Sequence, residues 1–309
     1  MRPNDWNLNN LTKNIKLAKT AGFCYGVKRA VETTKKLKSE NPTKNVCVLG
    51  ELIHNQNVIR ELENLGIKTI SDNNFDDISD ICVIRSHGAT PSVFETLMSK
   101  NAQIVDMTCP DVKKVQQKAI ELVQNGFLLI ILGKSDHPEV IAIKANAQKY
   151  SQNEDIFVVS NLCELSELET KIKTHKKVGV VIQTTQKLEL LKQTVNYLIP
   201  IVKDLRVFNT ICPSTTSRQN EAKNIAKESD LMIVVGSKKS ANTTHLAEIL
   251  KEITNTIHIE SQNELYLYKD IIDNAKNIGV TAGASTPDNI IENVILELNR
   301  ERQLLVNDL

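Results

Sequence analysis

Three of the six cysteines occur in the same sequence context at widely separated positions. Each begins a segment in which an amphipathic helical pattern leads to an apolar strand that ends in glycine, 24 to 26 residues later. The cysteines are Cys24, Cys109 and Cys212, and the glycines are Gly50, Gly133 and Gly236. Equivalent positions in three similar units would meet near one axis, so we expect the three sulfur atoms to share a single bound group.

Three isolated thiolates do not resemble the close cysteine pairs of zinc ribbons or fingers. They suit a cubane cluster, because the irons of such clusters prefer cysteine sulfur. We therefore predict one [4Fe–4S] cluster per chain. One of its irons would have no protein thiolate and could act as a Lewis acid and an electron donor. A zinc ion held by three cysteines would also keep an open position but would supply no electrons, and this alternative stays open.

The other three cysteines differ from this pattern. Cys47 and Cys82 lie inside apolar strand runs, where a small buried hydrophobic residue is the ordinary interpretation. Cys163 opens a helical stretch and has no matching position in the repeat. We expect none of the three to bind the cluster.

Polar side chains gather in the loops that follow the apolar strands. They are His54, His87, His137, Glu139, Thr184, Thr185, Ser240, Asn242 and Ser285. Histidine, serine and asparagine side chains can hold phosphate oxygens together with backbone N–H groups at helix N-termini. Any one of them could instead be a helix cap or a surface residue. Because they all fall at corresponding strand ends, we expect them to surround one cavity.

Glu139 lies in the segment HPEV, directly after the His137–Pro138 pair. This position places a carboxyl group in the same loop as a candidate phosphate ligand. The ordinary alternative is an acidic residue in the first turn of a helix, where the helix dipole favours it.

Short apolar runs alternate with amphipathic helical patterns over nearly the whole chain. Such runs are typical of parallel strands covered on both faces, so the predicted fold class is α/β. The candidate strands are Val46–Leu49, Ile81–Ile84, Phe127–Leu132, Ile156–Val159, Val178–Ile182, Leu231–Val235 and Ile278–Thr281. The clearest helical patterns are Val112–Gln124 and Leu188–Leu198.

The internal repeat predicts three similar α/β units in a pseudo-threefold trefoil around a central iron–sulfur cluster. We expect the units at residues 14–105, 106–206 and 207–299, after a polar N-terminal extension of residues 1–13. The alternative is chance similarity among strand–helix repeats.

The formal net charge is +1, from 38 basic and 37 acidic residues, which does not suggest a nucleic-acid or membrane-surface partner. No apolar run approaches the length that spans a bilayer, and the N-terminus has no secretory signal. We therefore expect a cytoplasmic protein. In that reducing compartment we expect the six cysteines to form no disulfides.

The motifs resemble those of the 4-hydroxy-3-methylbut-2-enyl diphosphate reductases, the last enzymes of the non-mevalonate (MEP) isoprenoid pathway. The resemblance covers about residues 15–297. It depends on AGFCYGVKRAV, GELIHN, RSHGA, DMTCP, HPEV, QTT, NTICPSTTSRQ, VVGSKKSANT and TAGASTPDNI, in that order. It implies an oxidoreductase that removes a hydroxyl group from an allylic diphosphate and yields isopentenyl and dimethylallyl diphosphates.

The resemblance also implies roles for single residues. Three cysteines would hold the [4Fe–4S] cluster: Cys24, Cys109 and Cys212. The diphosphate would be held by His54, His87, His137, Ser240, Asn242 and Ser285. Thr184 would lie near the substrate hydroxyl, and Glu139, with a pKa raised away from bulk water, would supply protons. The family often has serine at the position of Ala241, so one phosphate hydrogen bond worth about 1 kcal/mol would be missing or replaced by water.

No nicotinamide or flavin fingerprint occurs, so electrons should come from a separate carrier such as a ferredoxin or flavodoxin. Three other functions stay open. One is another three-cysteine cluster enzyme, similar to quinolinate synthase or a diphthamide-synthesis enzyme. The second is a cluster-bearing redox sensor without catalysis, and the third is a zinc hydrolase with three cysteine ligands.

Overall fold

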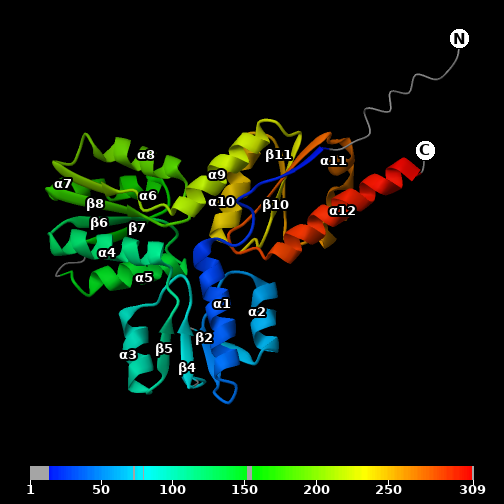
Figure 1. Cartoon of the computed structure of the whole chain (residues 1–309). Coiled ribbons are helices and arrows are strands. Elements are labelled where there is room, and N and C mark those ends of the chain that lie inside the picture. Colours follow the sequence, from blue (N-terminus) through cyan, green and yellow to red (C-terminus); the bar gives the residue numbers. More distant parts are fainter. Residues whose placement is uncertain (1–13, 72–73, 79, 152–154, 308–309) are drawn as a thin grey trace, which may run out of the picture. The chain divides into compact units, whose positions relative to one another are not determined.

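The computed structural model describes residues 14–71, 74–78, 80–151 and 155–307, so the polar extension 1–13 lies outside the described residues. The described chain contains three four-stranded sheets, and every strand pair in them is parallel (Figure 1). The predicted class, three similar α/β units, is confirmed. Within the described residues, no helix is both long and apolar enough to cross a membrane.

The three sheets have the same strand order. In the first, β3-β2-β4-β5, the strands are β2 (Val46–Leu49), β3 (Ile67–Ile70), β4 (Ile81–Ile84) and β5 (Gln103–Asp106). In the second, β7-β6-β8-β9, they are β6 (Leu128–Leu132), β7 (Ile156–Val159), β8 (Lys177–Ile182) and β9 (Asp204–Phe208). In the third, β11-β10-β12-β1, they are β1 (Asn14–Leu17), β10 (Leu231–Val235), β11 (Asn255–Ile259) and β12 (Asn277–Ala282).

Helices connect the strands of each sheet. Along the chain they are α1 (Tyr25–Glu40), α2 (Gln56–Asn64), α3 (Pro91–Ser99), α4 (Pro110–Gln124), α5 (Pro138–Gln148), α6 (Leu162–Glu167), α7 (Glu169–Thr174), α8 (Leu188–Leu198), α9 (Pro213–Ala226), α10 (Ala241–Lys251), the 3-10 helix η2 (Gln262–Tyr268), α11 (Lys269–Asn274) and α12 (Asp288–Asn307). Crossover connections of this kind are what parallel strands require.

The second sheet shows why its strands are continuous apolar runs. Leu128, Ile130 and Leu132 pack on one face against residues of α6, α7 and α8. Leu129 and Ile131 pack on the other face against residues of α4 and α5. Figure 1 shows this sheet between the two groups of helices. Because both faces are covered, every position of the strand must be apolar.

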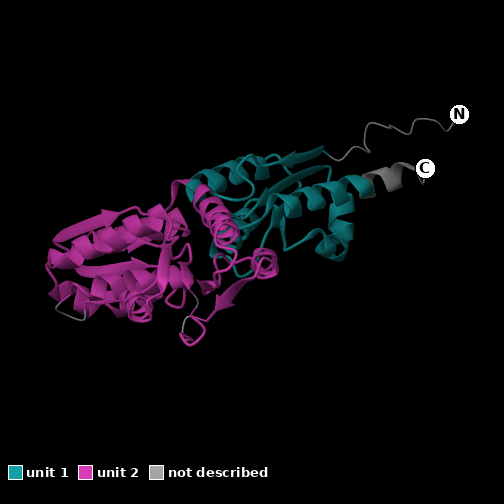
Figure 2. Cartoon of the chain, turned by 60° about the horizontal axis from the view of Figure 1, so that its bottom comes forward, with its two compact units in different colours: residues 1–24, 214–309 teal, residues 25–213 magenta. Residues whose placement is uncertain are grey.

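The chain divides into two compact units (Figure 2). Residues 25–213 form one and contain the first and second sheets. The segment that ends at Cys24 and the residues from Ser214 onward form the other, which contains the third sheet. The strand before each of the three motif cysteines (β1, β5 or β9) is an edge strand, and β1 pairs with β12 near the other end of the chain. The predicted boundaries at 14–105, 106–206 and 207–299 stay a prediction.

Cys47 and Cys82 are fully buried and lie opposite each other in register on β2 and β4. Their place in the apolar core is as expected. Cys163 is exposed on α6, so it does not belong to the core.

Candidate functional site

The loops that follow β2, β6 and β10 each begin with a glycine that makes the same backbone hydrogen bond. The backbone N–H of Gly50, Gly133 or Gly236 donates to a carbonyl at the end of the neighbouring edge strand, over 2.8, 2.9 and 2.9 Å. At Gly236 φ is +139° and a Cβ would collide with the Thr286 hydroxyl, so glycine is required there. The fourth residue after each glycine is His54, His137 or Ser240. These three candidates therefore occupy equivalent positions.

The three motif cysteines are also anchored in the same way. Each cysteine N–H donates to a carbonyl of the second loop of its sheet. The pairs are Cys24 with Ala284 at 3.2 Å, Cys109 with Ser86 at 2.9 Å, and Cys212 with Thr184 at 3.0 Å. Each cysteine directly precedes a helix, and the next loop residue after each carbonyl is Ser285, His87 or Thr185. The repeat predicted from the sequence therefore corresponds to a backbone hydrogen bond that recurs in all three sheets.

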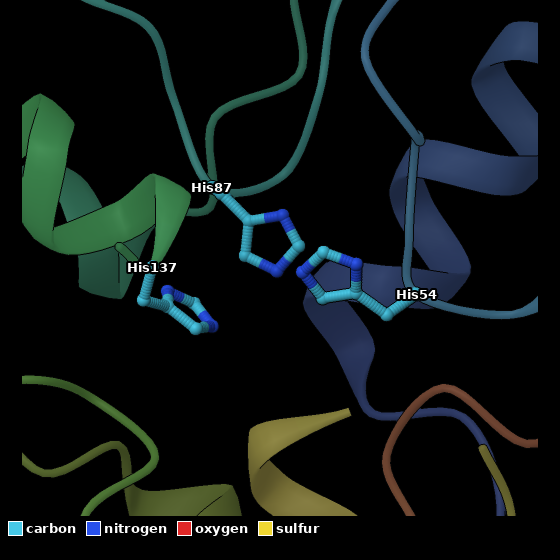
Figure 3. Close-up of side chains that lie close together, drawn as sticks. All are labelled: His54, His87 and His137. Atoms are coloured by element: carbon cyan, nitrogen blue, oxygen red, sulfur yellow. The ribbon is translucent and has the colours of Figure 1, made fainter. Parts of the chain in front are cut away.

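Three histidines from three different loops lie together in the unit formed by residues 25–213. Figure 3 shows their rings turned toward one another. The rings of His54 and His87 are stacked with centroids 4.5 Å apart, and the ring of His137 lies edge-on at 5.8 and 5.4 Å from them. One nitrogen from each ring lies within 4.8 Å of the others.

The hydrogen bond of the His137 ring favours an anion over a metal ion as its partner. The Nδ1 atom of His137 accepts the N–H of Glu139 at 3.2 Å, so the neutral ring carries its proton on Nε2 and donates there. His54 Nδ1 lies 3.0 Å from a carboxylate oxygen of Glu51 and must donate to it, so the Nε2 atom of His54 donates to an anion only when the ring carries a second proton. Burial, with the neighbouring His54, His137 and Arg85, holds the pKa of His87 well below its usual value. A bound phosphate would offset that repulsion and accept from the rings.

Glu139 lies in the first turn of α5 but does not face solvent as a simple dipole partner would. It is 1% exposed. One carboxylate oxygen accepts the Thr184 N–H at 2.7 Å and the other accepts the Thr184 hydroxyl at 2.8 Å. Burial raises the pKa of Glu139 to about 7, against the opposing effect of both bonds from Thr184. A carboxyl group with this pKa can hold a proton near neutral pH and give it up.

A chain of contacts connects this acid to one of the cysteines. Glu139 binds Thr184 through both oxygens, and the Thr184 carbonyl accepts the N–H of Cys212. The three histidines connect to the same chain of contacts through Glu139, because the N–H of Glu139 donates to His137. Hydrogen bonds therefore link the candidate anion site, the candidate proton donor and the candidate sulfur ligand.

Two residues not singled out from the sequence, Tyr25 and Asp111, join two of the cysteines. Asp111 Oδ2 accepts the Tyr25 hydroxyl at 2.6 Å and lies 3.0 Å from Cys212 Sγ, with the thiol as donor. The Tyr25 oxygen lies 3.9 Å from Cys109 Sγ. Burial alone would raise the pKa of Asp111, but bonds from Tyr25, Cys212 and Lys114 lower it. In the sequence Asp111 has the appearance of an ordinary first-turn acid, so nothing there signalled this contact.

In the other unit the candidates are neutral. Ser240, Asn242 and Ser285 are all buried. Ser240 is the N-cap of α10, yet its hydroxyl makes no capping bond within the described part of the chain. Asn242 Nδ2 is buried and has no hydrogen-bond partner among the described residues. Ala241, the first residue of α10, is buried as well. A buried polar group without a hydrogen-bond partner in the described chain, such as Asn242 Nδ2, is expected to bind a ligand or water.

Comparison with known proteins identifies the family. Residues 15–299 match the family model described as LytB protein. The chain belongs to the LytB family. A 4-hydroxy-3-methylbut-2-enyl diphosphate reductase of Syntrophotalea carbinolica is 40% identical over 283 residues, which are 91% of this chain and 96% of the relative. One from Clostridium tetani is 41% identical over 291 residues, 93% of this chain, and the chain spans 44% of that longer relative.

Solved structures agree with the family match. One described as (E)-4-hydroxy-3-methyl-but-2-enyl diphosphate reductase, the terminal enzyme of the non-mevalonate pathway, superposes with a TM-score of 0.68. It is 37% identical and covers 94% of this chain and 100% of its own. The corresponding reductase from Plasmodium falciparum gives a TM-score of 0.82 at 27% identity, covering 92% and 87%. The predicted reductase family is confirmed, and the quinolinate synthase-like alternative is not supported.

LytB enzymes are iron–sulfur proteins, which supports the predicted class of cofactor. The donors present fit such a group. Among the described residues, none of the three motif cysteines forms a disulfide bond. The N–H groups of Asp111 and Val112, at the start of α4, donate to Cys109 sulfur and oppose the rise that burial causes in its pKa. Helix N-termini of this kind stabilise a thiolate, the form that binds iron.

The unit of residues 25–213 brings together seven of the predicted LytB site residues, which are His54, His87, His137, Glu139, Thr184, Cys109 and Cys212. Thr185 lies beside them and accepts a hydrogen bond from Gln183. The remaining candidates belong to the other unit, namely Cys24, Ser240, Ala241, Asn242 and Ser285. Their contribution to the same site stays a prediction.

Proposed function

We propose that the chain reductively removes the hydroxyl group of (E)-4-hydroxy-3-methylbut-2-enyl diphosphate. Two electrons and two protons would yield isopentenyl or dimethylallyl diphosphate and water. The observation that carries this proposal is the continuous contact from the three histidines through Glu139 and Thr184 to Cys212. It combines an anion site and a proton donor with a candidate cluster ligand, as this reaction requires. Membership of the LytB family supports the same substrate.

The three histidines would bind the diphosphate. His137 donates from Nε2 because its Nδ1 is occupied by the Glu139 N–H. His54 is oriented by Glu51, and the ring of His87 contacts both other rings. In the other unit Ser240, Asn242 and Ser285 would add neutral hydrogen bonds. Binding energy from the diphosphate would then hold the reacting carbon in place, which lowers the barrier of the chemical step.

Glu139 would deliver the proton to the departing hydroxyl. Its carboxyl group reaches the active face through the Thr184 hydroxyl, which donates to it at 2.8 Å. When Glu139 is protonated, this bond reverses: the Glu139 O–H donates to the Thr184 oxygen and the Thr184 hydroxyl donates to the substrate oxygen, so Thr184 can relay a proton. The pKa of about 7 keeps a large fraction of Glu139 protonated at neutral pH.

Cys24, Cys109 and Cys212 would hold a [4Fe–4S] cluster. When bound, the cluster would supply the electrons and, at the iron without a protein thiolate, a Lewis-acid position for the substrate oxygen. We further propose that the electrons reach it from a ferredoxin or flavodoxin.

Turnover by anaerobically purified, cluster-loaded protein tests the proposal. The protein is mixed with the hydroxylated diphosphate and a one-electron donor, and the products are identified by mass spectrometry. We expect brown protein with about four irons per chain and the two isoprenoid diphosphates as products. Colourless protein that contains zinc would contradict the cluster. Brown protein without turnover of this substrate would instead favour a redox sensor.

A further inference from the structure

Asp111 is a buried carboxylate between two candidate cluster ligands. It is the second residue of α4, directly after the Cys109–Pro110 pair, and its side chain is 8% exposed. Its Oδ2 atom lies 3.0 Å from Cys212 Sγ. Tyr25, which donates to the same oxygen, also lies 3.9 Å from Cys109 Sγ. All of these residues belong to the unit formed by residues 25–213.

The position of Asp111 distinguishes one cysteine motif from the other two. Two residues after Cys24 the chain has Gly26, and two residues after Cys212 it has Ser214. Only the motif of Cys109 therefore carries a charge at this equivalent position. An acid that served only the helix dipole would face solvent and would not contact the sulfur of a cysteine 101 residues away.

In addition to the Cys212 thiol, two other groups contact the Asp111 side chain. The Tyr25 hydroxyl donates to it at 2.6 Å, and the Lys114 ammonium lies 3.3 Å from its other oxygen. When Cys212 loses its proton to become a cluster ligand, the thiol no longer donates to Asp111. The bonds from Tyr25 and Lys114 remain and can keep the charged carboxylate beside the sulfur.

We propose that Asp111, held by Tyr25 and Lys114, is a fixed negative charge that lowers the reduction potential of the cluster in this chain. The inference depends on the proposed function, because it requires a cluster on Cys109 and Cys212. Reduction adds negative charge to the cluster, and a carboxylate next to a ligand sulfur opposes that addition. A lower potential makes the reduced cluster a stronger donor toward the allylic hydroxyl. Asp111 is thus a positioning residue that acts through the ligand sulfur.

The experiment measures the midpoint potential of the cluster in the full chain, by anaerobic redox titration followed with electron paramagnetic resonance. In Asp111→Asn the amide keeps the shape and can still accept from Tyr25, but the charge is removed. At the wild-type midpoint we expect the ratio of reduced to oxidised cluster to rise about tenfold, which for one electron is a shift of about 59 mV.

Lys114→Gln supplies the opposite test. Lys114 is 71% exposed, so its replacement should not affect folding, and it leaves the Asp111 charge without its cationic partner. The ratio of reduced to oxidised cluster should therefore fall in Lys114→Gln. The decrease should be smaller than the increase in Asp111→Asn, because solvent screens an exposed ammonium. The matched controls are Glu121→Gln and Lys118→Gln, an ion pair farther along the same helix, which should change the ratio less than twofold.

Iron content separates this inference from the proposed function. A wild-type chain that binds no iron would contradict the proposed function itself. Loaded, active wild-type protein whose potential is unchanged in Asp111→Asn would overturn only the role of Asp111. If Asp111→Asn fails to load, Lys114→Gln decides: a lower potential supports the inference, and a potential equal to that of Lys118→Gln rejects it.

Discussion

The loops of the two compact units share a backbone hydrogen bond but carry different side chains. His54 and His137 in one unit and Ser240 in the other lie four residues after the glycine that donates this bond. In the unit of residues 25–213 these positions carry rings that can gain a proton, together with an acid whose pKa is about 7. In the other unit they carry neutral hydroxyl and amide groups.

Under the proposed function, one repeated scaffold would supply two kinds of phosphate contact. Charged or titratable donors bind an anion more strongly but respond to pH, because they must hold a proton to donate with full strength. Neutral donors bind less strongly and are insensitive to pH. We therefore expect proton chemistry in one unit and pH-independent recognition in the other.

The cysteines are the feature that all three repeats share, and their loss should have the largest effect. Cys24→Ser, Cys109→Ser and Cys212→Ser should each lose most of the iron and all turnover, since a cubane with two thiolate ligands is poorly held. Iron should be retained in three control variants, Cys47→Ala, Cys82→Ala and Cys163→Ala. Iron analysis checks this, and full iron in any of the three serine variants would remove that cysteine from the ligand set.

Glu139→Gln should lower turnover by about 10² to 10⁴ fold, because it removes the proposed proton donor. Iron content and substrate affinity should stay near wild type, since the amide has nearly the same shape. In the wild type, kcat/KM should fall as pH rises above about 7, where the free carboxyl group loses its proton. This decrease of kcat/KM with pH should be absent in Glu139→Gln. Turnover within a few fold of wild type would leave Glu139 with only a structural role.

The raised pKa of Glu139 also predicts a change in stability. Between pH 4.5 and about 7 the folded protein keeps a proton that the unfolded chain loses. The contribution of Glu139 to the free energy of unfolding is therefore full below pH 4.5 and is lost as pH rises through 7. Relative to Glu139→Gln, wild-type stability should fall by about 1.4 kcal/mol per pH unit in this window. Urea unfolding of both proteins at several pH values measures the difference.

His87→Ala and Ser240→Ala compare the two kinds of donor directly. His87→Ala should weaken substrate binding by about 10 to 100 fold at low pH, because an imidazolium bond to phosphate is worth about 1.5–3 kcal/mol. The loss should shrink as pH rises, since binding raises the pKa of the wild-type ring and the proton is released above it. Ser240→Ala should weaken binding by about fivefold at every pH. Equal pH dependence in the two variants would contradict the distinction.

Ala241→Ser should have the smallest effect and the opposite sign. Ala241 is buried at the start of α10, between two candidate phosphate ligands. A hydroxyl group there can add one hydrogen bond to the diphosphate, worth about 1 kcal/mol, so KM should fall about fivefold. The matched control is Thr244→Ser in the next turn of the same helix, which should leave KM unchanged. A higher KM in Ala241→Ser would show that the buried position cannot accept the oxygen.

The central strands could be predicted from the sequence to within one residue at either end. Ile81–Ile84 and Leu231–Val235, for example, match β4 and β10 completely. Their positions are apolar without interruption because both faces of a parallel sheet are covered. Among the edge strands, the sequence pattern predicts β7 but not β1, β3, β5, β9 or β11. Their exposure alternates or is partial, as at Asn14–Leu17, so the local pattern is too polar to identify.

By itself the sequence determined the α/β class, the repeat and the types of residue in the loops, because these depend on local patterns of apolar positions and on spacing. Only the tertiary structure decided which loop residues touch. Glu139 meets Thr184 across 45 residues, and Asp111 meets Cys212 across 101, in contacts that no local pattern specifies. The same burial that brings Glu139 against Thr184 raises its pKa, so its chemistry depends on the fold.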